Sequence, residues 1–305
     1  CIPNAGLPMN VDGQAVYPML PEPFARELLE FVTEFKINVV GGCCGTTPDH
    51  IRLLANLLKE VPQNPRPGNR VPMLASAVEA VPMQQEPAPF LIGERLNTQG
   101  SARFKKLMLV EDYESSLDLA RSQLEDGAHG LDVCVALSER TDEVDMMRRL
   151  VKLLSPSVRA PFVIDTTEPD VLESALQAAP GRCLINSTNL ESGREKLDKV
   201  FSLAKAYNAA VICLTIDEQG MAKTAARKLE IARRIYDIAV SEFHLKPGDL
   251  VFDDLTFTMA TGDPEYADSA IQTMEGIRLI KSELPGVLTS LGVSNVSFGL
   301  KPAAR

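Results

Sequence analysis

The chain has 305 residues, a formal net charge of −10 at pH 7, 45% hydrophobic residues and 24% charged residues. This length leaves room for one large barrel or two domains with an ample core, and the composition is ordinary for a globular protein. The acidic balance argues against nucleic acid or an anionic membrane surface as the main partner, and no apolar run is long enough to span a bilayer.

Residues 1–61 have the pattern of the end of a domain. Apolar residues at helical spacing predict a first helix, and they are Phe24, Leu28, Phe31 and Phe35. Residues 37–40 predict a short strand that leads into the glycine-rich residues 41–45, and Thr47 with Pro48 predicts the start of a second helix. A single strand-loop-helix unit preceded by a helix is too small to fold alone. The chain also begins with Cys1 rather than Met, so we expect it to be part of a longer protein.

The cysteines fall into two groups. The first group lies inside predicted buried strands and consists of Cys134, Cys183 and Cys213. Buried free thiols behave as small hydrophobic groups, and this usage suits a reducing cytoplasm. Cys43 and Cys44 instead follow the predicted strand at a glycine-rich bend, where two adjacent thiols are well placed to bind a soft metal ion. Buried structural thiols are the alternative, because a metal site needs a third ligand and Cys1 is a weak candidate for it.

Residues 62–89 are rich in proline. Prolines at positions 62, 65, 67, 72, 82, 87 and 89 interrupt every periodic pattern. We therefore expect an extended and fairly stiff linker between two domains, with Val71, Leu74 and Val78 available to pack on a neighbour.

From residue 90 onward, short apolar runs alternate with amphipathic helical patterns. The runs are residues 90–94, 131–133, 162–165, 184–186, 211–217, 250–253 and 293–296. The helical patterns are residues 113–125, 141–154, 169–178, 193–207, 225–243 and 264–284. Continuous apolar runs indicate strands buried on both faces, and the alternation predicts a parallel α/β sheet with right-handed crossovers. The expected fold is a (β/α)8 TIM barrel, and because seven strands are visible we expect it to lack its last βα unit of roughly 30 residues.

Polar side chains end or accompany these runs. Asp165, Asn186, Asp253 and Asn295 stand at the ends of four runs, Glu94 and Asn97 at the end of the first, and Asp132 within the second. The carboxyl ends of all strands of such a barrel converge on one face, where active sites lie. Carboxylates and amides in one pocket suit a flat heterocycle rich in N–H and C=O groups, such as a pterin or guanine. The alternative is that each residue caps the next helix or fixes its own loop.

The sequence gives no sign of other common catalytic motifs. His50, His129 and His244 stand beside no obvious nucleophile and at no metal-binding spacing. Residues 41–45 lack the spacing of a glycine-rich phosphate-binding loop. The polar strand ends therefore favour an enzyme or a small-molecule binder.

Two groups of motifs resemble known families. Residues 3–8 (Pro-Asn-Ala-Gly-Leu-Pro) and 39–48 (Val-Val-Gly-Gly-Cys-Cys-Gly-Thr-Thr-Pro) resemble the end of the homocysteine-binding, zinc-dependent methyltransferase barrel. Residues 93–97 (Gly-Glu-Arg-Leu-Asn), 164–167 (Ile-Asp-Thr-Thr), 185–188 (Ile-Asn-Ser-Thr), 217–220 (Asp-Glu-Gln-Gly) and 292–297 (Gly-Val-Ser-Asn-Val-Ser) resemble the pterin-binding barrel of methyltetrahydrofolate methyltransferases. In this order, over nearly the whole chain, they resemble the family of cobalamin-dependent methionine synthases. The resemblance implies the end of a homocysteine-binding domain in 1–61, a linker in 62–89 and a pterin-binding domain in 90–305.

The resemblance also implies an activity and a site. The implied activity is methyl transfer from 5-methyltetrahydrofolate to cobalamin and on to homocysteine, in the cytoplasm. Cys43 and Cys44 match two of three zinc thiolates, and zinc turns the homocysteine thiol into a thiolate nucleophile. The implied pterin ligands are Glu94, Asn97, Asp132, Asp165, Asn186, Asp253, Ser294 and Asn295, with Asn295 as the catalytic amide beside the methyl-bearing nitrogen. The implied partners are homocysteine and cobalamin domains of a full-length protein, since no Asp-x-His-x-x-Gly cobalamin motif occurs here.

Two residues depart from the family pattern. Cys134 stands where the family often has asparagine, and Asp254 follows Asp253 where a proline is common. The alternatives are a stand-alone methyltetrahydrofolate:corrinoid protein methyltransferase, a dihydropteroate synthase and a non-catalytic folate-binding module. Residues 1–61 argue against the first. A dihydropteroate synthase is expected to show a basic phosphate-binding pair late in the barrel.

Overall fold

The computed structural model describes residues 1–64, 71–262, 266–301 and 303. The chain divides into two compact units, Cys1–Arg70 and Val71–Arg305, and each is described by itself. Within the described residues, no helix has the length and apolar character needed to cross a membrane.

The first unit consists of a β-hairpin and two packed helices. The hairpin pairs β1 (Met9–Val11) with β2 (Gln14–Val16), and the helices are α1 (Pro21–Thr33) and α2 (Pro48–Leu58). The helices bury Phe24, Leu28 and Leu54 between them. At the start of α2, the Thr47 backbone N–H donates to the His50 ring 3.2 Å away, so this histidine caps a helix. Both helices predicted for residues 1–61 are therefore present.

The strand predicted at residues 37–40 does not form. A strand needs a neighbouring strand to pair with. In the described part of this unit, the only strands are β1 and β2, and they pair with each other. The backbone of residues 37–40 instead follows residues 1–5. The Cys1 amino group donates to the Val39 carbonyl over 2.7 Å, the Gly41 N–H donates to the Cys1 carbonyl over 3.0 Å, and the Cys43 N–H donates to the Pro3 carbonyl over 2.9 Å. These bonds fix the position of the two cysteines that follow.

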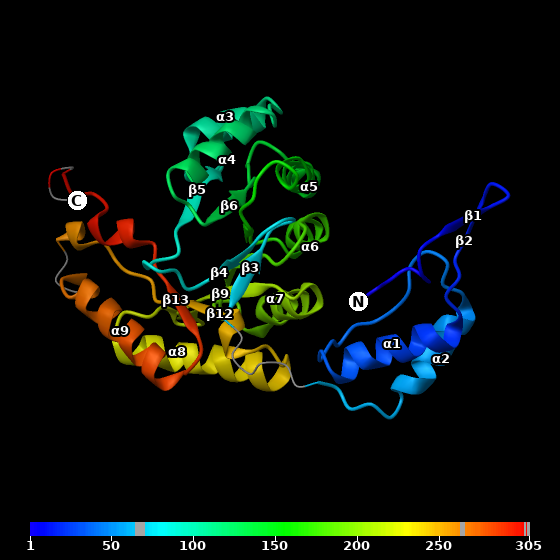
Figure 1. Cartoon of the computed structure of the whole chain (residues 1–305). Coiled ribbons are helices and arrows are strands. Elements are labelled where there is room, and N and C mark those ends of the chain that lie inside the picture. Colours follow the sequence, from blue (N-terminus) through cyan, green and yellow to red (C-terminus); the bar gives the residue numbers. More distant parts are fainter. Residues whose placement is uncertain (65–70, 263–265, 302, 304–305) are drawn as a thin grey trace. The chain divides into compact units, whose positions relative to one another are not determined.

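The second unit is built on a seven-stranded parallel sheet with helices around its outside (Figure 1). Its strands are β5 (Ile92–Asn97), β6 (Gly130–Cys134), β7 (Phe162–Asp165), β8 (Leu184–Thr188), β9 (Ala210–Leu214), β12 (Leu250–Asp253) and β13 (Leu288–Ser290). They lie side by side in chain order, and among the described residues no ladder joins β5 to β13. This is the curled α/β barrel sheet that the alternating pattern predicts.

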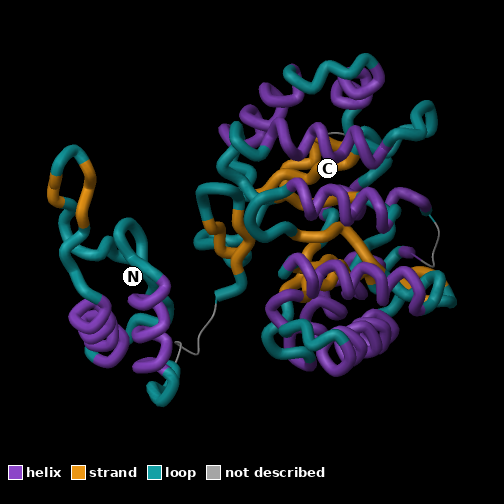
Figure 2. Tube along the Cα trace, turned by 90° about the vertical axis from the view of Figure 1, so that its right-hand side faces the viewer, coloured by secondary structure: helices purple, strands orange, loops and turns teal. Residues whose placement is uncertain are grey.

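The helices between the strands form the outer layer, which is also visible in the tube view (Figure 2). They are α3 (Ala102–Leu109), α4 (Ser115–Glu125), α5 (Glu143–Leu154), α6 (Pro169–Ala178), α7 (Arg194–Tyr207), α8 (Ala225–Asp237) and α9 (Ser269–Glu283). A π-helical turn at Ile238–Glu242 extends α8. Short 3-10 helices occupy Pro247–Asp249, Met259–Thr261 and Val293–Ser297, and a small hairpin pairs β10 (Ile216–Asp217) with β11 (Gly220–Met221). The predicted start of the last helix at residue 264 lies outside the described residues.

The last strand lies earlier in the chain than expected. Residues 293–296 form a 3-10 helix, whereas the strand that pairs with β12 is Leu288–Ser290. The chain turns directly after this strand, where the Asn295 N–H donates to the Gly292 carbonyl over 3.0 Å. The polar Ser294 and Asn295 are exposed in this turn and not buried in a strand.

Two apolar clusters lie on opposite faces of the sheet. The larger outer cluster packs the strands against the helices, and it takes Leu131, Val133, Phe162 and Ile164 from two neighbouring strands. The inner cluster takes the alternate positions of the strands and consists of Leu74, Val163, Leu184, Ala210, Ile212, Val251 and Leu288. Burial on both faces explains why the strands appear in the sequence as continuous apolar runs.

A second hairpin occurs within the proline-rich stretch. It pairs β3 (Met73–Ala75) with β4 (Ala80–Pro82), and Leu74 is fully buried in the inner cluster. Arg182 precedes β8. Its guanidinium donates to the Met73 carbonyl over 2.5 Å and to Asp249 over 2.6 Å. Residues 71–83 are therefore part of the second unit, and they cover one end of its inner face.

Candidate functional site

The register of the strands places the polar strand ends on the inner face. Asp165 is two residues after the inward-facing Val163, Asn186 is two after Leu184, and Asp253 is two after Val251. Because side chains alternate between the two faces of a strand, all three point to the inside of the sheet. Asp165 and Asn186 are also direct partners in the β7–β8 ladder. The structure thus brings these predicted residues to one face, at the carboxyl ends of the strands.

Asn97 connects two of the carboxylates. Its side-chain amide donates to Asp132 over 2.9 Å and to Asp165 over 2.7 Å, and its carbonyl oxygen accepts the Gln99 backbone N–H over 2.9 Å. The Asn186 amide donates to the other oxygen of Asp132 over 3.3 Å. Both amide hydrogens of Asn97 are committed to protein carboxylates, so it fixes the spacing between Asp132 and Asp165.

The two carboxyl groups have raised pKa values. Asp132 is only 1% exposed, and burial, followed by the negative charge of Asp165, raises its pKa to about 7. The hydrogen bonds from Asn97 and Asn186 act in the opposite direction. Burial also raises the pKa of Asp165, and the nearby Glu94 charge adds to this, while the bond from Asn97 lowers it. Asp132 and Asp165 together can therefore hold one proton near neutral pH, and the remaining negative charge is shared between the two carboxyl groups.

Asp132 gives a prediction about stability and pH. The folded protein keeps the Asp132 proton up to about pH 7, whereas an unfolded aspartate loses it near pH 4. The folded state thus binds more protons in this window, so the free energy of unfolding falls as pH rises from about 4 to about 7, by up to about 1.4 kcal/mol per pH unit for this group. In Asp132→Asn this slope should be smaller. Urea unfolding of both proteins at several pH values measures it.

A matched control and an opposite outcome are available for this prediction. Asp198→Asn changes a carboxylate on the outer helix α7 and should leave the slope as in the wild type. Asp254, whose pKa burial raises to about 7 as well, should keep part of the slope in Asp132→Asn. Identical slopes in wild type and Asp132→Asn would show that Asp132 is ionised throughout.

Asp253 is held at the end of β12 by its own loop. Its carboxylate accepts the Leu255 backbone N–H over 2.8 Å. Burial raises its pKa, and the Leu255 bond and the Lys228 charge lower it. In the β12–β13 ladder Asp253 stands opposite Ser290, which marks the carboxyl ends of the last two strands of the sheet.

The remaining predicted residues lie nearer the surface. Glu94 is exposed on β5, where the strand pairing with β6 is irregular, and its charge acts on Asp132 and Asp165. Ser294 and Asn295 are exposed in the 3-10 helix after β13. Within the described residues, no hydrogen bond joins their side chains to the Asp132–Asp165 group. Cys134 follows Asp132 by two residues and is buried on the same face. Burial raises its pKa to about 11, so it is a neutral thiol.

Sequence reasoning missed Lys228, which contacts the Asp253 loop from α8. Its side chain is 1% exposed. It precedes Ile231, Ala232 and Ile235 at spacings of three, four and seven residues, and these three are buried. A lysine in the apolar stripe of a helix was the available signal, because lysines are almost never fully buried unless they are paired.

In the first unit, Cys43 and Cys44 are exposed with their sulfur atoms 3.8 Å apart. Two thiolates on one tetrahedral zinc ion, each at about 2.3 Å, lie about 3.8 Å from each other, so this separation fits such a pair. Tyr17 lies beside them, and its pKa is raised by burial and by the Cys44 thiol. Within the described residues, no cluster of three histidine, cysteine or acidic side chains is arranged for a metal ion. The pair can thus supply two ligands of a metal site.

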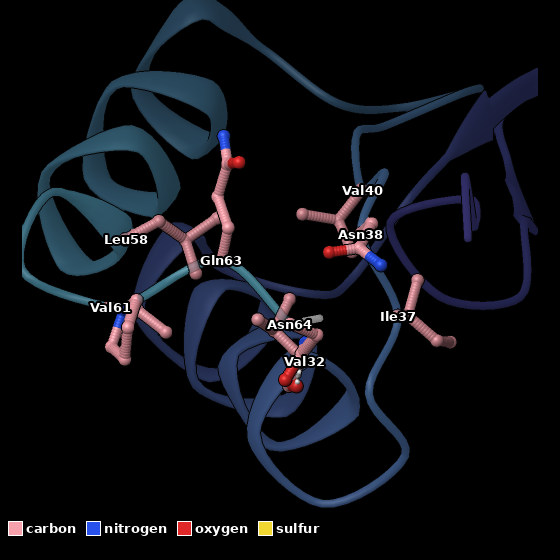
Figure 3. Close-up of a pocket in the computed structure, with 9 residues that line it drawn as sticks. Val32, Ile37, Asn38, Val40, Leu58, Val61, Gln63 and Asn64 are labelled. Atoms are coloured by element: carbon pink, nitrogen blue, oxygen red, sulfur yellow. Dashed lines mark hydrogen bonds between the residues drawn. The ribbon is translucent and has the colours of Figure 1, made fainter. Parts of the chain in front are cut away.

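The first unit also has a pocket of about 120 Å³ (Figure 3). It lies between the ends of α1 and α2, and its lining includes Val32, Val40, Leu58 and Asn64. The Asn64 side chain donates to the Val32 carbonyl over 3.0 Å and so ties the end of this unit to α1. Neither cysteine of the pair lines the pocket, which is therefore separate from the cysteine site.

Comparison with known families agrees with this geometry. The family model described as pterin binding enzyme matches residues 93–305, and the model described as homocysteine S-methyltransferase matches residues 1–58. The chain belongs to the pterin-binding enzyme family. It is similar to methionine synthase of Mycobacterium tuberculosis (strain ATCC 25618 / H37Rv), with 43% identity over 307 residues, and to methionine synthase of Mycobacterium leprae (strain TN), with 41% identity over 312 residues. Each match covers 100% of this chain and 26% of the relative, so the chain spans about a quarter of their length.

Solved structures show the same fold. Dihydropteroate synthase of Xanthomonas albilineans, in complex with indole-2-carboxylic acid and 6-chloroguanine, has a TM-score of 0.50 and 16% sequence identity, covering 74% of this chain and 78% of that one. This likeness confirms the expected barrel class. The pterin-binding family expected from the motifs after residue 90 is confirmed by the family model, and the similarity to two methionine synthases agrees with the resemblance of the whole chain.

Proposed function

We propose that this chain is the folate-binding part of a cobalamin-dependent methionine synthase, which transfers the methyl group of 5-methyltetrahydrofolate to cobalamin and on to homocysteine. The observation that carries the proposal is the group of Asp132, Asp165 and Asn186 on the inner face of a pterin-family sheet. Similarity to methionine synthases over the whole chain supports it.

The carboxylates suit the hydrogen-bonding edge of a pterin. A pterin presents neighbouring N–H donors, and a carboxylate accepts two parallel N–H bonds well. In this proposal, Asp165 and Asp253 accept from the ring, Asp132 and Asn186 complete the pocket, and Asn97 keeps the acids in position. Glu94 and Ser294 are proposed to contact the ring from the rim.

Methyl transfer needs help at the nitrogen that loses the methyl group. A tertiary amine is a poor leaving group, so charge that develops on N5 of the pterin must be stabilised as the bond to carbon breaks. We assign this role to the Asn295 amide, whose hydrogen bond to N5 strengthens in the transition state. Cobalamin, proposed to be bound by another domain, supplies a strongly nucleophilic cobalt centre when present.

For homocysteine activation, Cys43 and Cys44 are proposed as two zinc ligands, with the third ligand coming from another part of the full-length protein. Zinc supplies Lewis-acid activation of the homocysteine thiol when bound. The three buried free thiols, Cys134, Cys183 and Cys213, support a reducing location, and we propose the cytoplasm. The other methionine synthase domains are the proposed partners.

The cysteine pair can be tested with cobalt as a probe for zinc. Adding Co²⁺ to the chain should produce the near-ultraviolet charge-transfer absorption of thiolate bound to cobalt, because both sulfur atoms are exposed and correctly spaced. The band should weaken in Cys43→Ser and disappear in the variant with both cysteines replaced. Cys1→Ser is the control and should keep the band. A band that survives the double replacement would exclude the pair as the metal site.

The folate proposal is tested by titration calorimetry of the chain with 5-methyltetrahydrofolate. Saturable binding with one site per chain is the expected result. Addition of reduced free cobalamin should then yield methylcobalamin, which a non-catalytic folate-binding module does not produce. A folded chain that binds no methyltetrahydrofolate, or that instead joins p-aminobenzoate to a pterin diphosphate, contradicts the proposal.

A further inference from the structure

We propose that Lys228 is a positioning residue. It binds the backbone carbonyls of Asp254 and Leu255 from the side of the helices, and it thereby fixes the direction of the Asp253 carboxylate toward the pterin site. The inference rests on the proposed function, because it explains how one proposed ligand of that site is held. Lys228 itself does not touch the substrate in this proposal.

The contacts of Lys228 are with the loop after β12. Its ammonium group donates to the backbone carbonyls of Asp254 and Leu255, the second over 2.9 Å. The side chain rises from α8 and is 1% exposed, so these bonds form in a dry environment. Hydrogen bonds from a charged donor are stronger than those between neutral groups, and burial of a lysine without such partners is costly.

The loop needs this support because its backbone is unusual. Leu255 has a φ of 53°, a left-handed conformation that is uncommon for a residue other than glycine. Such a conformation persists when the surrounding structure fixes it. Here the Leu255 carbonyl accepts from Lys228 and from Thr273, the latter over 2.9 Å, while the Leu255 N–H donates to Asp253. The same residue thus connects the buried lysine to the proposed ligand.

Asp253 and Asp254 serve opposite faces of the sheet. Asp253 points inward with Val251, and Asp254 is fully buried on the side of the helices. A methyl group built on Gly276 of α9 would lie 2.1 Å from a carboxylate oxygen of Asp254, so the glycine makes room for that side chain. No hydrogen bond reaches this carboxylate from the described residues. Burial lowers the pKa of Lys228, and the negative charges of Asp254 and Asp253 act in the opposite direction.

These contacts explain the aspartate that stands where the family commonly has proline. Once it ionises, at about pH 7 and above, Asp254 supplies an opposing charge for the buried lysine. The N–H groups of Lys228 donate to backbone carbonyls and not to this carboxylate. Substrate contact is therefore left to Asp253, and the two helices α8 and α9 set its direction. A purely structural lysine is the competing explanation, and it predicts effects on stability alone.

The test compares folate binding with stability in two variants of the full 305-residue chain. Lys228→Met removes the donors and keeps an unbranched side chain as far as the ε-carbon. Lys228→Met combined with Asp254→Asn also removes the uncompensated buried charge, so it should recover most of the lost thermal stability. Because a displaced Asp253 carboxylate loses charge-assisted hydrogen bonds to the pterin, we expect the dissociation constant for 5-methyltetrahydrofolate to rise at least about tenfold in both variants.

A second measurement, made on the loop itself, distinguishes a local change at Leu255 from a general loss of stability. Amide hydrogen exchange at Leu255 should be faster in both variants, because its carbonyl loses the Lys228 bond and its left-handed conformation is released. Lys199→Met is the control, since Lys199 is exposed on α7 and pairs with Glu195 on the same helix, and it should match the wild type throughout. If Lys228→Met does not fold, the double variant gives the answer.

The outcomes separate this inference from the proposed function. Normal folate binding in the double variant, with wild-type binding intact, overturns the role of Lys228 and leaves the proposed function in place. Recovery of both stability and affinity in the double variant also overturns it, because the lysine would then act only through the buried charge. A folded wild-type chain that binds no methyltetrahydrofolate overturns the proposed function, and the role of Lys228 with it.

Discussion

Replacing Asn295 with alanine is expected to slow methyl transfer about 10²- to 10³-fold, the typical cost of removing one preorganised donor from a catalytic site. Binding of 5-methyltetrahydrofolate should weaken far less. The reason is that N5 gains charge only as the methyl group leaves, so a hydrogen bond to it strengthens mainly in the transition state. Asn295 is exposed in the turn after β13, at the carboxyl end of the sheet, so its side chain has room to reach a bound pterin.

The measurement is a single-turnover reaction with reduced free cobalamin, beside calorimetry of folate binding by the same protein. Ser297→Ala is a matched control, because the Ser297 hydroxyl donates to the Ser294 carbonyl in the same turn without being a proposed ligand. It should keep both rate and affinity near the wild-type values. Equal losses of rate and affinity in Asn295→Ala would mean that this amide contributes plain binding and no selective stabilisation of the transition state.

The sheet could be predicted from the sequence because its strands are buried on both faces. β6, β7, β8, β9 and β12 each lie within or overlap a continuous apolar run. The seventh strand was misplaced because residues 293–296 also look strand-like, whereas pairing with β12 selects Leu288–Ser290. The strand predicted at residues 37–40 was wrong for a related reason, since a strand requires a neighbouring strand to bond with. In both segments, pairing with a distant strand determines whether a strand forms, and the local sequence pattern does not reveal that pairing.

The convergence of the polar strand ends could be predicted from the sequence, but the hydrogen bonds among them could not. Asp165 and Asn186 were recognisable as strand ends, and parallel register brings them together. The bridge from Asn97 joins residues 35 and 68 positions away, so only the folded sheet shows that this amide organises Asp132 and Asp165. The apolar stripe of α8 indicates that Lys228 is buried, but its partners were equally hidden, because they are carbonyl groups that every residue carries.

Asp165→Ala should weaken binding of 5-methyltetrahydrofolate by about 100-fold, since hydrogen bonds to a charged group contribute about 1.5–3 kcal/mol and a bidentate pair lies at the upper end. Two losses combine. The pterin loses a carboxylate acceptor, and one N–H of Asn97 loses the partner that holds it at 2.7 Å. The second loss loosens Asp132 as well, because the same amide donates to it.

Asp165→Asn separates these two contributions. It keeps an oxygen that can accept from Asn97, but it replaces the other acceptor by a donor that opposes the N–H groups of the pterin edge. If ligand recognition dominates, Asp165→Asn should bind as poorly as Asp165→Ala in calorimetry while remaining more stable to urea. Asp198→Ala, on the outer helix α7, is the control for removing a carboxylate. Wild-type affinity in Asp165→Ala would remove this residue from the pterin site, and the fixed pair with Asn97 would then be a structural feature of the sheet.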